Sequence, residues 1–373
     1  MVNSSVHFYL IGFLTKRLQK TLEEKMTKRE IIIDGAEGEG GGQVLRSSLS
    51  LSAITGKPVR IEDVRGRRKK PGLFRQHLTA FKAAAEICDA KVEGAELKSR
   101  EIAFHPGEIK AGDYHFSIGS AGSAMLVAQT VLPILSHAKG ESTVRITGGT
   151  HNLWAPTFEF FDQTFLPLFR KMGGRAQAEL GAYGFNPAGG GEIILKIKPH
   201  GTPNRLDLLS RGERLSTQLD VVLSGIKRGI ASREVKVIAN GFNLSEDQSA
   251  INHVESAGPG NVMTLALEFE NLTQLFTEIG QKGISSEAVA NQLCKRAKGY
   301  LQAKDKDGSM SVATCDHLAD QLLLPMALLG GGVFTTTDIS QHTYTNIDII
   351  RAFVNVEISV NQIAKKCWLI EVN

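Results

Sequence analysis

The chain has 373 residues, of which 42% are hydrophobic, so it is long enough for two domains with a substantial core. Its net charge is +4, and residues 1–28 supply +3 of it, so the remainder is close to neutral and bulk charge does not indicate a nucleic-acid-binding protein. The four cysteines form no CxxC pair, which excludes the usual zinc spacings, and no apolar run reaches the roughly 18 residues that span a bilayer.

The N-terminal segment has no recognisable targeting signal. Its apolar run 7–14 has no basic residue before it and no small-residue cleavage site after it, so we do not expect a signal peptide. Met26 directly precedes the first predicted strand, so residues 1–25 are interpreted as the product of an upstream start. We expect residues 1–28 to be a disordered extension, and the protein to be cytoplasmic with reduced thiols.

From residue 30 onward, one order of strands and helices recurs. The first unit is predicted as strand 30–35, helix 43–54, strand 59–64, helix 72–88, and strands near 90–94 and 101–105. The second is strand 114–118, helix 122–137, strand 142–147, helix 157–172, and strands near 175–181 and 192–198. The third is helix 316–329, strand 333–338, helix 345–353, and strands 355–360 and 367–372, with an opening strand near 205–210.

About 100 residues interrupt the third unit. Strands at 216–225 and 261–270 and a helix at 285–303 predict a separate small α/β unit there. We therefore predict an α/β (α+β) protein whose large domain contains three repeated βαβαββ-type units. The large domain takes residues 29–210 and 311–373, and a smaller α/β domain (211–310) is inserted in the third repeat.

A glycine-rich turn, EGEGGGQ at 37–43, joins the first strand to the first helix. A dinucleotide-binding fingerprint would need glycine at Gln43, and a P-loop would need Lys-Ser/Thr at Gly41 and Gly42, so both motifs are excluded. Bare backbone N–H groups at a helix N-terminus can still bind an anion. The two glutamates in this turn are compatible with a bound anion only if a cation lies between a glutamate carboxylate and the anion. The alternative is a tight turn whose glutamates are simply solvated.

The segment RGRRKKPGLFR at 65–75 carries six basic side chains and no acid. Pro71-Gly72 prevents a helix from running through it, so we expect a loop that either follows a polyanion backbone or is simply a solvated surface. Only Phe74 lies nearby, so this segment does not indicate base stacking. Contact with a backbone or a terminal phosphate is the better interpretation.

Two polar features stand beside helix starts near the C-terminus. Asp320 and Gln321 occupy the first turn of an apolar helix, where an acid either has a functional role or merely favours the helix dipole. His342, in SQHTYTN, is expected two to three residues before a helix capped by Thr345. The positive end of that helix disfavours imidazolium, so a neutral, nucleophilic ring nitrogen is expected. His77, in the RQH run, is expected on a helix surface, and the alternative is that it contacts RNA. The histidines expected to be structural or merely exposed are His7, His105, His115, His137, His200 and His253.

Together these segments resemble the RNA 3′-terminal phosphate cyclases. The resemblance is carried by EGEGGGQVLRSSLSLS, RGRRKKPGLFRQHL, IGSAGSAMLVAQTVLP, HLADQLLLPMAL and SQHTYTN, in the family's order from about residue 29. It implies repeated units with an inserted smaller domain, and ATP-dependent conversion of an RNA 3′-phosphate to a 2′,3′-cyclic phosphate. The implied route forms a covalent histidine–AMP and then an adenylylated RNA 3′-phosphate.

The resemblance also assigns residues to roles. His342, Glu39 and Arg46 would be catalytic, and Arg65, Arg68 and Gln76 would bind the RNA phosphate. The residues implied in ATP binding are Gln129, His317, Leu318, Ala319, Asp320 and Gln321. Glu39 and Asp320 would hold a divalent cation, Mg²⁺ or Mn²⁺. Many cyclases have tyrosine at the position of His317, which puts the adenine contact there in question.

Two other classes of protein share features with this chain. Relatives of the cyclases in ribosome assembly keep the fold without the chemistry, but the histidine at 342 argues against such a binding protein. Enolpyruvyl transferases share a repeated architecture and lack the SQHTYTN context. No membrane and no obligate protein partner is expected, and a homo-oligomer is compatible with the sequence.

Overall fold

The computed structural model describes residues 30–38 and 41–373. The predicted extension 1–28 and Glu39 lie outside the described residues. Within them the chain has the mixed α/β character that the sequence predicts. The elements follow the predicted order closely, with most boundaries shifted by one to three residues.

Three four-stranded sheets share one strand order. In each, the first strand is parallel to the second, and the fourth lies antiparallel between the second and the third. The first sheet contains β1 (Ile31–Asp34), β2 (Val59–Glu62), β3 (Lys91–Glu93) and β4 (Ile102–His105). The second contains β5 (Asp113–Ser117), β6 (Ser142–Gly148), β7 (Arg175–Ala182) and β8 (Gly191–Lys198). The third contains β9 (Leu206–Leu208), β14 (Gly332–Thr336), β15 (Ile358–Ala364) and β16 (Cys367–Val372).

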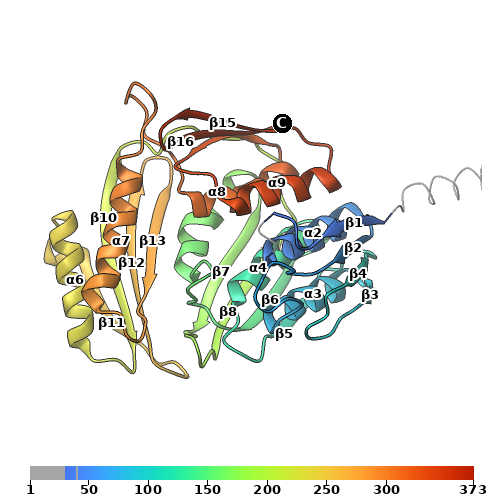
Figure 1. Cartoon of the computed structure of the whole chain (residues 1–373), viewed down its shortest axis with the longest axis horizontal. Coiled ribbons are helices and arrows are strands. Elements are labelled where there is room, and N and C mark those ends of the chain that lie inside the picture. The colour runs from blue at the N-terminus through green and yellow to red at the C-terminus, as the bar shows by residue number, and fades with distance from the viewer. Residues whose placement is uncertain (1–29, 39–40) are drawn as a thin grey trace, which may run out of the picture.

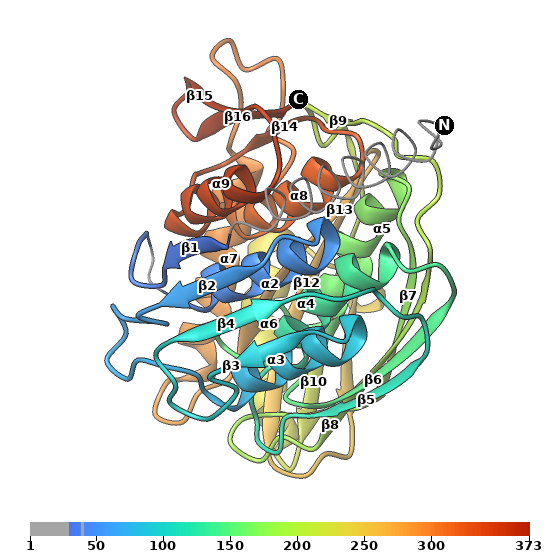
Figure 2. The same ribbon diagram turned by 90° about the vertical axis from the view of Figure 1, so that its right-hand side faces the viewer.

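The helices that connect these strands pack together on the inner side of the three sheets (Figures 1 and 2). They are α2 (Gly42–Thr55), α3 (Arg75–Cys88), α4 (Ala124–Ser136), η1 (Phe160–Phe165) running into α5 (Leu166–Lys171), α8 (Asp316–Leu328) and α9 (Gln341–Phe353). Helix α2 contacts α3, α4 and α9, and α9 also contacts α8. Helices from all three predicted units therefore meet in one central layer.

The fourth sheet, in the order β11-β10-β12-β13, comes entirely from the residues between β9 and α8. It contains β10 (Arg214–Ser224), β11 (Ser249–His253), β12 (Gly260–Phe269) and β13 (Thr273–Ile279). Helices α6 (Arg228–Phe242) and α7 (Ser286–Leu301) pack on each other and cover its outer face (Figure 1), with the short turn η2 (Glu246–Gln248) before β11. Helix α6 was not predicted. That this sheet and its helices form a separate domain with boundaries at residues 211 and 310 stays a prediction.

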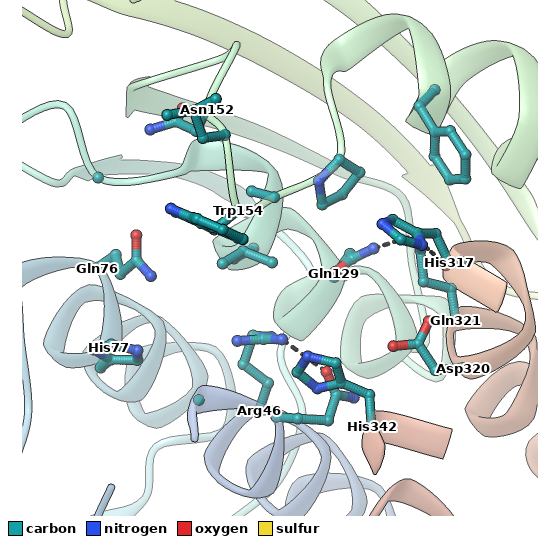
Figure 3. A pocket seen from close by; sticks show the side chains of 18 of the residues that line it. Arg46, Gln76, His77, Gln129, Asn152, Trp154, His317, Asp320, Gln321 and His342 are labelled. Atoms are coloured by element: carbon teal, nitrogen blue, oxygen red, sulfur yellow. Dashed lines mark hydrogen bonds between the residues drawn. The ribbon is translucent and has the colours of Figure 1, made fainter. Parts of the chain in front are cut away.

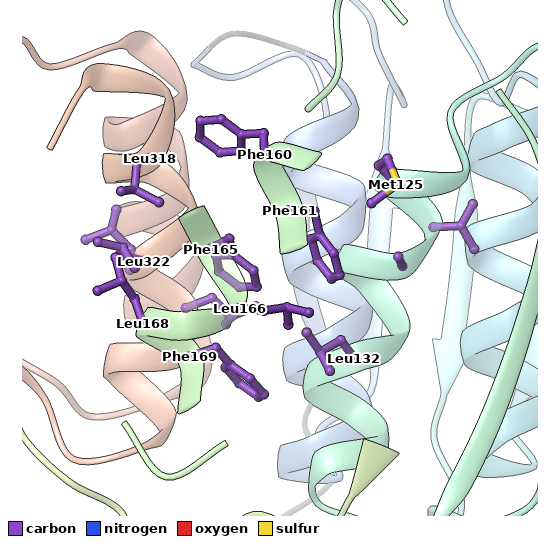
Figure 4. Packing of buried hydrophobic residues seen from close by; sticks show 14 of the residues in the cluster. Met125, Leu132, Phe160, Phe161, Phe165, Leu166, Leu168, Phe169, Leu318 and Leu322 are labelled. Carbon is purple, nitrogen blue, oxygen red and sulfur yellow. The ribbon is translucent and has the colours of Figure 1, made fainter. Parts of the chain in front are cut away.

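A row of phenylalanines fixes the distance between α4 and α8. Phe161, Phe165 and Phe169 stack in sequence with ring centroids 5.4 and 6.0 Å apart, and all three are buried. Figure 4 shows this row between α8, with Leu318 and Leu322, and α4, with Leu132. Burying aromatic rings of this size contributes several kcal/mol of stability, at roughly 25 cal/mol per Å².

The fourth sheet is joined to this core by buried hydrogen bonds. The amide of Leu275 in β13 donates to Thr164 Oγ1 (3.2 Å), and the amide of Cys315 donates to Gln274 Oε1 (3.2 Å). The second bond lies directly before α8, so β13 and the start of α8 are held side by side. All four cysteines are buried as free thiols. Over residues 30–38 and 41–373, every helix is too short or too polar to cross a lipid bilayer.

Candidate active site

One large cavity, about 1090 Å³ in volume, lies where the central helices meet the fourth sheet. Its walls come from the first turns of α2, α3, α8 and α9, from α4, from the loop 152–156, and from β13 and α7. Figure 3 shows side chains from these elements converging on it. The predicted site residues that line it are Arg46, Arg65, Arg68, Gln76, Gln129, His317, Asp320, Gln321 and His342.

The glycine turn and the basic loop lie against each other at the mouth of α2. A Cβ added at Gly41 would lie 2.6 Å from the Arg68 guanidinium, and one at Gly42 would lie 2.8 Å from His77 Nε2. At Gly42 the buried His77 ring leaves no space for a side chain, whereas at Gly41 the nearest atoms are the end of the flexible Arg68 side chain, which can shift. Gly41 caps α2 without a side-chain hydrogen bond, so backbone N–H groups at this end are available to an anion.

His342 is the second residue of α9 and not a residue before it. The sequence placed the start of the helix at Thr345, but Ser340 is the cap, because its Oγ accepts from the amide of Thr343 at 3.2 Å. Thr345 lies inside the helix and donates back to Gln341 O (2.9 Å). The correction keeps His342 at the positive end of the helix. Burial lowers the pKa of His342, so its ring is neutral at pH 7 even though Asp320 opposes that shift.

A polar network joins the helices that carry Arg46, His342 and Asp320. Arg46 donates to Gln43 Oε1 (2.7 Å), and Gln43 donates to Ser47 Oγ (3.0 Å). Ser47 donates across to Asn346 Oδ1 (2.6 Å) in α9, and Asn346 donates to the carbonyl of Asp320 (2.8 Å) in α8. These bonds hold α2, α8 and α9 in register, which sets where their functional side chains meet.

Asp320 and Arg46 carry opposite charges at the bottom of the cavity. Burial raises the pKa of Asp320 to about 6, with His342, His317 and Arg46 opposing the change. Burial lowers the pKa of Arg46 to about 10, so the guanidinium stays charged at neutral pH. Asp320 Oδ1 is buried and accepts no hydrogen bond from the described residues. A buried, charged oxygen of this kind suits a cation ligand.

The fit to a divalent cation rests on that single oxygen. Within residues 30–38 and 41–373 no cluster of three or more histidine, cysteine or carboxylate side chains could hold a metal ion. The second predicted ligand, Glu39, lies outside the described residues. Asp320 is therefore compatible with the predicted site, and the remaining ligands would have to include Glu39, the nucleotide or water.

The predicted ATP-binding residues divide into two groups. Gln129 donates to Gln321 Oε1 (2.6 Å) across the gap between α4 and α8, and Gln321 donates to the carbonyl of His317 (2.6 Å). His317 Nδ1 lies 3.0 Å from Asp316 Oδ1, a contact that raises the pKa of the imidazole. Leu318 and Ala319, by contrast, are wholly buried in the hydrophobic core and do not line the cavity. They face the opposite side of α8.

The predicted phosphate-binding residues are fixed by local contacts. Arg65 donates to the carbonyls of Lys70 and Gly72 (3.0 and 2.9 Å), and its guanidinium lies 4.2 Å from the centroid of the Phe74 ring. Gln76 Oε1 accepts from the amide of Ser123 (2.9 Å), which ties α3 to the turn before α4. The loop thus presents Arg65, Arg68 and Arg75 at the cavity, next to Gln76.

His77 was expected on a helix surface, and that prediction is wrong. The side chain is 6% exposed, lines the cavity, and accepts through Nδ1 from the amide of Phe74 at 3.2 Å as part of a capping box. Burial first, and then Arg65, Arg46 and Arg68, lower the pKa of His77 to about 3. Its ring is turned back toward the start of the helix because α3 begins at Arg75, which makes His77 the N3 residue whose Nδ1 accepts from the N-cap amide.

His77 should weaken the fold as the pH falls. The folded state holds the ring neutral down to pH about 3 while the unfolded chain protonates near 6.5, so stability is lost from pH 6.5 downward. At pH 5 the loss is about 2 kcal/mol. His77→Gln keeps the capping box and does not titrate, so its urea-unfolding free energy should change less between pH 7 and 5 than the parent's. Equal changes in both proteins would contradict this assignment.

Several cavity residues were not found from the sequence. Trp154, in the loop 152–156, is 93% exposed, and Asn152 of the same loop donates to the carbonyl of Ala121 (2.6 Å). From the fourth sheet, Arg296 on α7 pairs with Glu278 on β13 at 2.8 Å. An exposed tryptophan has no periodic signal, and the contribution of the fourth sheet depends on tertiary packing.

The chain has a weak similarity to a solved structure. The crystal structure of the enolpyruvyl transferase NikO from Streptomyces tendae aligns with a TM-score of 0.34 and 9% identity, and the alignment covers 92% of this chain and 48% of that one. This chain thus spans about half the length of that protein. A family model, in contrast, matches residues 37–360, which include every cavity residue described above. It is the model for RNA 3′-terminal phosphate cyclase, and the chain belongs to that family.

Proposed function

We propose that this protein converts the 3′-terminal phosphate of RNA to a 2′,3′-cyclic phosphate at the expense of ATP. A ring nitrogen of His342 attacks the α-phosphorus of ATP, pyrophosphate leaves, and AMP stays bonded to that nitrogen. An oxygen of the RNA 3′-phosphate then displaces the histidine and forms a phosphoanhydride with AMP. The neighbouring 2′-hydroxyl attacks the RNA phosphorus, its proton is released, and AMP departs.

The observation that carries this proposal is the setting of His342. A histidine with a lowered pKa lines a cavity that also holds a charged arginine and a charged carboxylate. A neutral imidazole is a competent nucleophile toward phosphorus, and fixed positive groups stabilise the charge that develops on the phosphoryl oxygens. Arg46 and the N-terminus of α2 can serve that role. Bound Mg²⁺ or Mn²⁺, which Asp320 and Glu39 would hold, would neutralise further phosphate charge.

The direct test is incubation with ATP labelled at the α-phosphate. The proposal expects label on the protein that is released by acid, as a phosphorus–nitrogen bond requires, and release of labelled AMP when RNA with a 3′-phosphate is added. RNA with a 3′-hydroxyl should leave the label in place. A protein that takes up no label but binds RNA would instead be a noncatalytic relative of the cyclases.

The same strand order in three sheets supports three copies of one ancestral unit. The chain leaves this order only between β9 and α8, where the fourth sheet lies. We infer that this sheet and its two helices form an inserted unit, which closes one side of the cavity through β13 and α7.

The basic loop is expected to act on RNA more than on ATP. Arg65→Ala and Arg68→Ala should slow transfer of AMP to the RNA at least about tenfold while changing self-adenylylation by less than about threefold, because a lost phosphate contact weakens only the ligand it touches. Added salt should reproduce the effect in the parent. The two half-reactions are measured separately with labelled ATP. If self-adenylylation fell as far as overall cyclisation, these arginines would serve the ATP phosphates.

His317 is expected to face the adenine ring. A tyrosine ring covers more of an adenine than an imidazole does, and an aromatic contact of this kind is worth on the order of 1 kcal/mol. His317→Tyr should therefore lower the ATP concentration for half-maximal self-adenylylation by roughly fivefold, and His317→Ala should raise it. A tyrosine variant that binds ATP more weakly than the parent would indicate that the Asp316–His317 pair hydrogen-bonds the nucleotide.

A further inference from the structure

The loop 152–156 lines the cavity and presents an indole to solvent there. Trp154 is 93% exposed, although an aromatic side chain of this size usually buries most of its surface. Figure 3 shows its ring among the cavity side chains, on the Gln76 side of Gln129. An exposed aromatic ring on a cavity wall is available to stack on a ligand that enters the cavity.

The loop is anchored on both sides of the indole, so the exposure is built in. On one side His151 is 1% exposed, its Nε2 lies 2.9 Å from Glu159 Oε2, and its ring stacks on Tyr183 with centroids 5.2 Å apart. Next to it, Asn152 donates to the carbonyl of Ala121. On the other side the chain enters η1, whose phenylalanines are in the core. These contacts fix the backbone on both sides of Trp154, so its exposed ring is presented at the cavity, where a flat ligand can stack on it.

Trp154 lies on a different wall of the cavity from His317, the predicted adenine contact. The turn 120–123 is tied to the loop through Ala121 and to α3 through the bond from Ser123 to Gln76. Trp154 therefore belongs to the wall that also carries Gln76, Arg65 and Arg68, the predicted RNA side. His317, Gln321 and Gln129 form the other group. A cavity of about 1090 Å³ has space for a nucleotide in each group.

We propose that Trp154 is the stacking platform for the base of the 3′-terminal nucleotide of the RNA. Every base has a π face, so stacking holds a single-stranded end without reading its sequence, while the neighbouring arginines hold its phosphate. Purines cover more of an indole than pyrimidines, so RNAs that end in A or G bind more tightly. This inference rests on the proposed function. It supplies the base-stacking contact that the basic loop does not provide.

The test compares the parent, Trp154→Phe and Trp154→Ala on two RNAs with a 3′-phosphate. One carries an ordinary terminal adenosine, and the other an abasic ribose at that position, with its 2′-hydroxyl and 3′-phosphate intact. Trp154→Ala should raise the KM for the ordinary RNA by about fivefold to a hundredfold, with the phenylalanine variant in between. For the parent, the KM for the abasic RNA should exceed the KM for the ordinary RNA by a similar factor. For Trp154→Ala, the two RNAs should have nearly the same KM.

Binding gives a second readout that does not depend on turnover. In a Trp368→Phe background Trp154 is the single tryptophan, and its fluorescence should be quenched by the ordinary RNA and not by the abasic RNA. If Trp154→Ala instead raised the ATP requirement of self-adenylylation with an unchanged KM for RNA, the indole would stack on adenine and the proposal would be overturned. If the parent cyclises RNA and Trp154→Ala has the same KM for that RNA, the stacking inference is overturned and the proposed function stands. A parent that takes up no AMP overturns the proposed function as well.

Discussion

His342→Ala should abolish both the covalent adenylate and RNA cyclisation, with a loss of at least about a thousandfold, while leaving the fold intact. The loss is large because no other group takes over the bond to AMP once the nucleophile is removed. The fold should survive because His342 is at the cavity wall, in the first turn of α9, whose cap is Ser340. The variant is assayed with α-labelled ATP at saturating concentration, and its thermal unfolding is compared with the parent's.

His115→Ala is the matched control, since this exposed histidine on β5 lies outside the cavity. It should keep the parent's rate. Acid-labile label that persists on His342→Ala would move the nucleophile to another residue, and His317 would be the next to test because it lines the same cavity.

Arg46→Ala should slow self-adenylylation by about a hundredfold to a thousandfold at saturating ATP. Removing one preorganised donor from a developing oxyanion typically has this effect, and the buried position of Arg46 strengthens its interaction with charge. Arg46→Lys keeps a positive charge but loses the planar donor group that bonds Gln43, so its rate should be intermediate. The parent, Arg46→Ala and Arg46→Lys are compared by their initial rates of label uptake.

Arg67→Ala serves as the control for Arg46. This arginine is on the same basic loop as Arg65 and Arg68, and it donates to the carbonyl of Gly38 (2.9 Å) without lining the cavity. It should reduce label uptake by less than about threefold. A result in which Arg46→Ala adenylylates normally and fails only with RNA would assign Arg46 to the RNA phosphate.

The sequence predicted most of the elements, because their hydrophobic periodicity and glycine turns are local signals. The start of α9 was misplaced because Ser340 and Thr345 are both good caps, and the choice between them depends on packing against α2 and α8. The inward position of His77 also depends on where α3 begins. Both errors follow from the residue at which a helix begins, which differs from the prediction by three residues in α3 and by four in α9.

The cavity itself was only partly predictable. The residues predicted for catalysis and for RNA came from motifs in the sequence, and the described ones among them meet in one place. Trp154 joins them from a loop and Arg296 from helix α7, and nothing in their local sequence distinguishes them from other surface residues. Leu318 and Ala319 belong to a predicted ATP-binding stretch but do not line the cavity. A sequence motif covers consecutive residues, whereas only one face of a helix can line a cavity.

The bond from Ser47 to Asn346 joins side chains that are 299 positions apart in sequence. Contacts of such separation form late, because the entropy of closing the long loop between them must be overcome first. Helix α9 leaves the ribosome long after α2, so His342 and Arg46 come together only after the long stretch between them has been made. We therefore expect any activity that needs both residues to appear in a late phase of refolding.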